Sequence, residues 1–309
     1  MSEPKVQQSN SNIDTGPLVV VGIDGSPESA AAARWAADEA VRRHEQLKLV
    51  YSSFLPLLGY PAMGYPVGFV ELADQHGRDL LANMAREINS RHPGLTLTTE
   101  QLQSDPRKAL VDASRAASLT VLGNRGGGRL QDVMVGSVAL HVAGHAHSPV
   151  AVIPKEHQRR GGPILVGVDG SANSTAAIAF AFDEAAVRGV DLVAVLTFDD
   201  WAAQGLASRP VEFSVAGTQE EHLVMSEELA GWREKYPDVQ LRQEVFRGQA
   251  ADCLIGFAED APLAQQPQMI VVGSRGRGGL TGLFLGSTSH ALISHAKCPV
   301  VVVRPPHGQ

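Results

Sequence analysis

The sequence predicts an α/β protein built as two tandem domains, each with an open parallel five-stranded sheet flanked by helices. The first supporting observation is length, because 309 residues suggest about two domains. The second is an internal repeat, in which PLVVVGIDGS at residues 17–26 returns as PILVGVDGS at residues 163–171. The third is the alternation of short β-branched runs with longer helical patterns, which is typical of strand–helix–strand units.

The repeat also predicts the domain limits. Each half contains, in the same order, a first strand, the motif Gly-x-Asp-Gly-Ser, a glycine-spaced loop and a Pro-Val-rich last strand. The charged segment PKEHQRRGG at residues 154–162 lacks apolar periodicity and separates the halves. We therefore expect a disordered tail at residues 1–15, a first domain at 16–156 and a second domain at 157–309.

Within each domain, the short apolar runs predict buried parallel strands. Ser26 and Pro27 predict the start of the first helix, because a serine hydroxyl caps free N–H groups and proline suits the first turn. In the first domain we expect strands at 17–23, 47–54, 95–102, 119–122 and 149–153, and helices at 26–44, 69–91, 107–117 and 130–146. In the second domain we expect strands at 164–168, 190–197, 239–246, 269–272 and 299–303.

Composition excludes several classes of protein. The net charge of −7 disfavours a nucleic-acid-binding surface, which needs concentrated Lys and Arg. The longest apolar runs, such as VVVV at residues 300–303, are far below the ~18 residues of a membrane span. Cys253 and Cys298 are too few for a disulfide framework, and the polar N-terminus has no signal-peptide pattern. We expect a cytoplasmic protein without membrane or nucleic-acid partners.

Two loops indicate an anion-binding function. They read GNRGGGRLQDVMVGSV at residues 123–138 and GSRGRGGLTGLFLGST at residues 273–288, and both follow the spacing Gly-x2-Gly-x9-Gly-Ser. Glycine lets backbone N–H groups approach an anion closely, and a helix that begins nearby adds unpaired donors. Asp24 and Asp169, which follow the first strands, suit ribose hydroxyls. These features together predict a nucleotide pocket at the carboxyl edge of each sheet.

Other interpretations of these residues stay open. The glycines and Asp24 are also typical of plain turns between a strand and a helix. His141 and His145 lie one helical turn apart and suggest a metal site, but the second half does not repeat that spacing. The Pro- and aromatic-rich segment 54–69 suits a lid, a partner surface or a long crossover loop. The chain has no GxxxxGK[ST] motif and no recognisable catalytic triad, and neither glycine loop reads GxGxxG directly after the first strand.

The glycine spacing, the first strand that ends in x-Asp, and the Pro-Val-rich last strand resemble the universal stress protein family. The resemblance covers nearly all of residues 16–305 and is greatest to the tandem-domain members of mycobacteria and related actinobacteria. In that family the spacing marks the ATP-binding branch. The resemblance implies a Rossmann-like, adenine nucleotide alpha hydrolase-like fold, two ATP molecules per chain with Mg²⁺ carried on ATP, and two halves packed as an internal pseudo-dimer through their last strands.

The resemblance also implies roles for particular residues. The aspartates would contact ribose, the ends of the second strands would contact adenine, and the glycine loops and following helices would hold the phosphates. Arg125 and Arg275 lie within these loops, where they can screen phosphate charge or stay solvated. The implied adenine-nucleotide residues are Gly22, Ile23, Asp24, Ser52, Leu122, Gly123, Gly126, Gly136, Ser137 and Val138 in the first half, and Gly167, Val168, Asp169, Thr197, Val272, Gly273, Gly276, Gly286, Ser287 and Thr288 in the second.

Three functions compete at this point. The first is an ATP-binding regulator of growth or survival under stress, which acts through nucleotide-dependent conformation or through an unknown regulatory protein partner. The second is a slow ATPase or nucleotidyl-transfer enzyme, although no general base is evident in the sequence. The third is an interaction scaffold whose glycine loops are structural relics. The sequence leaves both a monomer and a homodimer of such chains open.

Overall fold

The structure is a computed structural model that describes residues 16–53, 68–126, 135–155, 161–198, 219–262, 265–276 and 284–305. The expected tail at residues 1–15 lies outside the described residues. So does most of the segment 54–69, of which only residues 68 and 69 are described.

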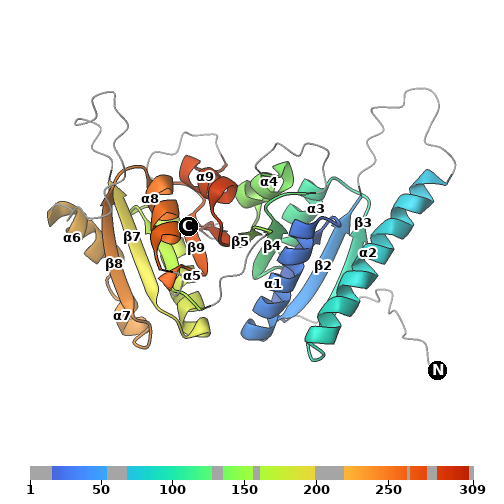
Figure 1. Cartoon of the computed structure of the whole chain (residues 1–309), viewed down its shortest axis with the longest axis horizontal. Coiled ribbons are helices and arrows are strands. Elements are labelled where there is room, and N and C mark those ends of the chain that lie inside the picture. Colours follow the sequence, from blue (N-terminus) through green and yellow to red (C-terminus); the bar gives the residue numbers. More distant parts are fainter. Residues whose placement is uncertain are drawn as a thin grey trace.

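The described chain forms one ten-stranded sheet in the order β3-β2-β1-β4-β5-β10-β9-β6-β7-β8 (Figure 1). Each half supplies five neighbouring strands, and every pairing inside a half is parallel. The predicted fold class is therefore confirmed. The strands are β1 (Leu18–Ile23), β2 (Gln46–Ser52), β3 (Leu97–Leu102), β4 (Leu119–Gly123), β5 (Val150–Ile153), β6 (Ile164–Val168), β7 (Leu192–Phe198), β8 (Leu241–Arg247), β9 (Met269–Gly273) and β10 (Val300–Val303).

The last strands of the two halves join the sheets. β5 and β10 pair antiparallel, with Val300 opposite Val152 and Val302 opposite Val150. Both strands are fully buried, because helices cover them on either face of the sheet. The expected internal pair of domains is therefore present, and it takes the form of one continuous sheet in which neither last strand is an edge.

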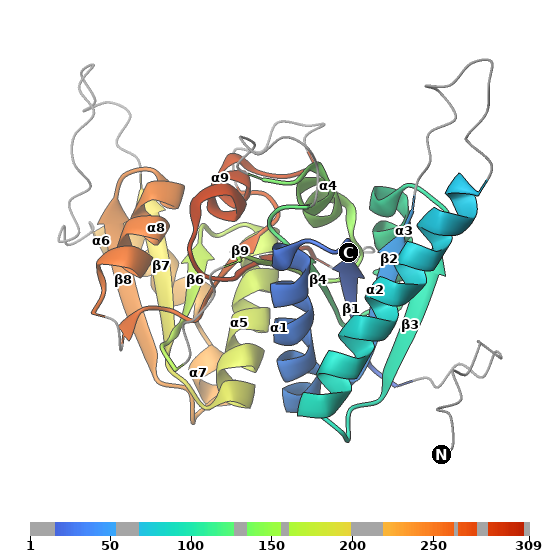
Figure 2. The same ribbon diagram turned by 45° about the vertical axis from the view of Figure 1, so that its right-hand side comes forward.

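Helices cover both faces of this sheet (Figure 2). One apolar core lies under α1, α2, α5 and α6, and a second lies on the opposite face under α3, α4, α8 and α9. The helices are α1 (Pro27–Arg43), α2 (Phe69–Arg91), α3 (Pro106–Ala113), α4 (Ser137–His145), α5 (Ala172–Arg188), α6 (Gln219–Glu228), α7 (Trp232–Lys235), α8 (Ala250–Asp260) and α9 (Ser287–His295).

Two predicted helices of the first half are shorter than expected. The helix predicted at 107–117 ends at Ala113, because the next residues form tighter turns in which Ala116 N–H bonds to the Ala113 carbonyl. The helix predicted at 130–146 begins at Ser137, because Gly136 is its extended N-cap residue. Residues 130–134 of that prediction lie outside the described residues.

A buried charge cluster holds the two halves together on the face of α1 and α5. Arg43 Nε donates to Glu39 Oε1 over 2.8 Å, and Arg188 Nε donates to Glu184 Oε2 over 2.8 Å. Crossed pairs, Arg43 with Glu184 and Arg188 with Glu39, join the two helices. Both glutamates are almost fully buried, so their charges depend on these arginines.

Candidate functional site

Two cavities open at the carboxyl ends of the strands, one in each half. The first lies where β1 neighbours both β2 and β4, and the second lies where β6 neighbours both β7 and β9. At these points the strand order reverses direction, and such switch points leave a crevice that ligands occupy in open α/β sheets. We call the two cavities the first site and the second site.

The first site has a volume of about 990 Å³ and the second about 410 Å³. Both values lie within the range of about 300–1,000 Å³ that is typical of small-molecule sites. Every residue that the sequence predicted for nucleotide binding lines one of them. The first site is lined by Gly22, Ile23, Asp24, Ser52, Leu122, Gly123, Gly126, Gly136, Ser137 and Val138. The second site is lined by Gly167, Val168, Asp169, Thr197, Val272, Gly273, Gly276, Gly286, Ser287 and Thr288.

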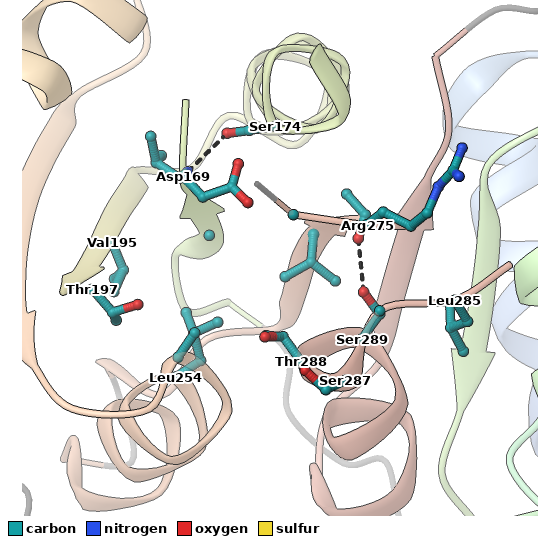
Figure 3. A pocket seen from close by; sticks show the side chains of 17 residues that line it. Asp169, Ser174, Val195, Thr197, Leu254, Arg275, Leu285, Ser287, Thr288 and Ser289 are labelled. Atoms are coloured by element: carbon teal, nitrogen blue, oxygen red, sulfur yellow. Dashed lines mark hydrogen bonds between the residues drawn. The ribbon is translucent and has the colours of Figure 1, made fainter. Parts of the chain in front are cut away.

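Figure 3 shows how the second site is arranged. Asp169 at the end of β6 lies on one side, and Ser287 and Thr288 at the start of α9 lie on another. Thr197 and Leu254, from β7 and α8, lie on a third side. The pocket thus has a carboxylate, a helix N-terminus and a partly apolar wall on different sides.

Asp24 and Asp169 are turn residues that also line the two cavities. One carboxylate oxygen of Asp24 accepts from the Ser26 amide at 2.9 Å, and one oxygen of Asp169 accepts from the Ser171 amide at 3.0 Å. These bonds form the turns that start α1 and α5. The other oxygen of each aspartate lies beside the glycine loop. A Cβ added to Gly126 would lie 2.7 Å from Asp24 Oδ2.

The starts of α4 and α9 present unpaired backbone donors. Their N-cap residues are Gly136 and Gly286, which have no side chain to cap the helix. Within the described part of the chain, no hydrogen bond engages the amides of Ser137 and Val138 at the start of α4, or those of Ser287 and Thr288 at the start of α9. Such amides, together with the positive end of the helix dipole, favour a bound phosphate.

Two predicted glycine donors differ from expectation. The Gly136 amide donates to the Asn124 carbonyl at 2.8 Å, and the Gly286 amide donates to the Ser274 carbonyl at 2.7 Å. The chain itself therefore uses these two N–H groups, although both glycines line their cavities. The donors available to a ligand are those of the next residues along each helix.

Gly123 and Gly273 line the cavities and also have a packing role. A Cβ on Gly123 would lie 2.8 Å from the backbone carbonyl carbon of Glu28 in α1. A Cβ on Gly273 would lie 2.9 Å from the equivalent atom of Asn173 in α5. These glycines let the strand end pack directly against the first turn of the neighbouring helix.

Sequence reasoning missed several residues of the sites. Val50 and Leu110 form an apolar wall in the first site, and Val195 and Leu254 occupy the equivalent positions in the second. Aligning the two halves beyond their glycines would have revealed these pairs. Glu28 and Lys155 also line the first site, but Asn173 and Pro305 stand at their positions in the second half, so the repeat carries no signal for them.

Positive side chains lie near each glycine loop. Arg125 lines the first site and Arg275 lines the second. Burial lowers the pKa of Arg304, and the charge of Arg275 lowers it further. The Arg304 guanidinium follows β10 and donates to the Gly144 carbonyl in α4 of the other half.

His141 and His145 pack against each other. Their rings stack with centroids 4.1 Å apart, and the His145 ring also packs on Phe284 of the second half. Burial lowers the pKa of His141, and electrostatic interactions with His145 and Arg107 lower it further. Nowhere in the described ranges do three His, Cys, Asp or Glu side chains group as metal ligands. Cys253 and Cys298 are both buried, and neither forms a disulfide within the described chain.

No helix in the described portion of the chain combines the length and apolar character needed to cross a bilayer.

Comparison with known proteins places this geometry in a family. Residues 18–154 and 162–304 each match the universal stress protein family. A universal stress protein of Mycobacterium tuberculosis is 38% identical over 311 residues, which is 98% of this chain and 99% of the relative. One from Mycolicibacterium smegmatis is 38% identical over 296 residues, covering 93% of this chain and 97% of the relative.

A solved universal stress protein structure from Archaeoglobus fulgidus has a similar fold, with a TM-score of 0.67 at 17% identity. The alignment covers 96% of this chain and 98% of that one. The family match spans both halves, and the mycobacterial relatives extend over nearly the whole chain. The chain therefore belongs to the universal stress protein family and is of its tandem-domain type.

Proposed function

We propose that this chain is an ATP-binding regulatory protein that holds one nucleotide in each half and acts through nucleotide-dependent conformation or partner binding. The observation that carries the proposal is the pair of helix starts at the cavities, whose first amides have no hydrogen-bond partner among the described residues. Phosphates are the ligands that such amides favour. The aspartates at the first strand ends supply acceptors for ribose hydroxyls.

The residues present fit an adenine nucleotide. Gly126 and Gly276 bring the loop so close to the aspartates that a Cβ would meet a carboxylate oxygen at 2.7 Å or 2.5 Å. The apolar walls, formed by residues such as Leu110 and Leu254, suit a flat base. Mg²⁺ would enter on the nucleotide, held mainly by phosphates and water.

A physical route links the two sites and supports a regulatory role. Helix α4 begins in the first site, and its last turn contacts the second half. Arg304 donates to the Gly144 carbonyl, and Phe284 packs on His145. The residue after Phe284 lines the second site, so a shift at either site acts on shared packing.

The test is the nucleotide content of the purified protein. Mass spectrometry of acid-released small molecules should find about two adenine nucleotides per chain. Ser137→Glu or Ser287→Glu should each lower the content to about one, because a carboxylate at the helix start competes for the amides and repels phosphate. At a separation of about 4 Å and an effective dielectric constant of about 20, the repulsion between the new carboxylate and a phosphate is about 4 kcal/mol. We therefore expect the nucleotide affinity of the substituted site to fall about 100-fold or more.

Both serines are exposed, and an acidic residue suits a helix start, so the fold should survive these changes. Ser226→Glu, at an exposed serine of α6 outside both cavities, is the matched control and should leave the content at two. A protein that retains two nucleotides after Ser137→Glu, or that never contains any, contradicts the proposal.

One observation favours slow ATP hydrolysis as a second candidate function. Glu28 lines the first site, and no hydrogen bond or ion pair engages its carboxylate among the described residues. A free carboxylate in a nucleotide site can serve as a general base toward water. Steady-state phosphate release that disappears in Glu28→Gln, while ATP stays bound, would support the enzyme. If the unmodified protein releases no phosphate, the regulatory function remains and the enzyme is ruled out.

A further inference from the structure

The end of the second strand differs between the two sites in a way that bears on base recognition. Ser52 ends β2 opposite Leu102, and Thr197 holds the equivalent place on β7 opposite Phe246. Each hydroxyl-bearing residue lines its own cavity. The two hydroxyls, however, have different hydrogen-bond partners.

The Ser52 hydroxyl already donates its proton to another residue of the chain. Ser52 Oγ donates to the Ser104 carbonyl over 2.6 Å, a short and well-formed bond. A serine hydroxyl has one proton and two acceptor lone pairs. Toward the first site, Ser52 therefore offers only an acceptor.

The Thr197 hydroxyl, by contrast, has no hydrogen bond to any residue that the structure describes. Gly248 stands where the first half has Ser104, with φ of +140°, and no hydrogen bond joins its carbonyl to Thr197. Within the described chain Thr197 Oγ1 has no partner, and Figure 3 shows it turned toward the interior of the second site. This hydroxyl can rotate, and so it can either donate or accept.

The same strand end is where a base would lie, if the proposed nucleotide function is correct. The phosphate donors are at the starts of α4 and α9, whereas the apolar walls lie beside β2 and β7. In the second site, Val195 and Leu254 flank Thr197 on that wall. A base that packs on these apolar side chains brings its polar edge to the strand-end hydroxyl.

We propose that this hydroxyl sets the base specificity of each site, so that the two sites differ. The first site selects a base with a donor at this edge, such as the amino group of adenine. It rejects a base with a carbonyl there, because two acceptors would face each other. The second site takes either base, because the Thr197 hydroxyl reorients. The inference rests on the proposed function and deepens it.

The experiment compares ATP with ITP, which carries a carbonyl where ATP carries the amino group. Full-length Ser287→Glu protein reports the first site, and Ser137→Glu protein reports the second. Equilibrium dialysis gives the dissociation constant of each nucleotide. In the first site we expect ATP to bind about 10-fold or more tightly than ITP, since an unpaired buried polar group is penalised strongly. In the second site the ratio should be below about 3-fold.

Substitution of the two hydroxyl-bearing residues tests whether their hydroxyls cause the difference in base preference between the sites. Ser52→Ala in the first site should bring the ATP to ITP ratio close to one. Thr197→Val in the second should weaken both nucleotides alike and leave their ratio unchanged. Ser53→Ala is the matched control, because its side chain does not line the cavity. It should keep the first-site preference.

The outcomes separate this inference from the function it rests on. Equal ATP to ITP ratios in both sites, with ATP bound, would overturn the specificity inference and leave the proposed function intact. A first-site preference that persists in Ser52→Ala would also overturn it. Failure of the unmodified protein to bind either nucleotide would overturn the proposed function and this inference together.

Discussion

The two halves of the chain share their backbone geometry but not their charges. Each half has the same aspartate turn, the same close glycine and the same uncapped helix start. Around that frame, Glu28 and Lys155 line the first site, whereas the second half has Asn173 and Pro305 in their places. Backbone amides and glycines therefore set the shape of each site, whereas the side chains at its rim differ between the halves.

The same divergence appears in the buried charge cluster between the halves. Glu39 and Glu184 are equivalent, and each contacts both Arg43 and Arg188. Glu39 gains a third arginine, Arg42, whose place in α5 is taken by an exposed valine. Burial by itself acts to raise the pKa of both glutamates. The arginines, led by Arg188, outweigh burial at Glu39 and lower its pKa, whereas at Glu184 the neighbouring Glu39 adds to burial and the pKa rises.

The largest expected effect is on stability. Glu39→Ala leaves three arginines with one glutamate, and two of these arginines, Arg43 and Arg188, are largely buried. Removing one partner of such a buried group costs about 3–5 kcal/mol. We expect Glu184→Ala to cost less, because its charged form is less favoured in the fold. Urea denaturation of the two variants measures this difference.

An exposed glutamate is the control for both variants. Glu71 in α2 is exposed and has no hydrogen bond or ion pair in the described structure, so Glu71→Ala should change stability by less than about 0.5 kcal/mol. If Glu39→Ala and Glu184→Ala lower the free energy of unfolding by the same amount, Arg42 does not make the two glutamates differ in their contribution to stability.

A smaller effect separates the two glycines of the first loop. Gly123→Ala would push a Cβ against the α1 backbone, and overpacking of this kind costs about 1–3 kcal/mol of stability. In Gly126→Ala the Cβ would meet only the Asp24 side chain and no backbone atom, so we expect it to displace the aspartate and lower nucleotide affinity more than stability. Thermal unfolding and nucleotide content, measured on both variants, test the distinction. The reverse pattern would show that Gly126 is the packing residue.

Much of this molecule could be predicted from the sequence, because the repeat doubles every local signal. The alternation of apolar runs with helical patterns predicted the α/β class with parallel strands, and the glycine spacing predicted residues that line both cavities. The use of the Gly136 amide by Asn124 could not be predicted, since it depends on how the loop closes in space. The crossed pairs of the α1–α5 cluster likewise depend on the docking of two helices that are far apart in sequence.

The smallest expected effect is a difference in acid sensitivity at Glu39. Its folded-state pKa lies below the ordinary value of 4.5, so the unfolded chain binds this proton more readily than the folded one. The stability that Glu39 contributes is therefore complete above about pH 4.5 and is lost as the pH falls toward the folded-state pKa. Glu39→Gln, which cannot ionise, should lose less stability than the unmodified chain between neutral pH and pH 4. Urea denaturation across that range measures the two slopes, and parallel curves would mean that the arginines do not favour the ionised form of Glu39.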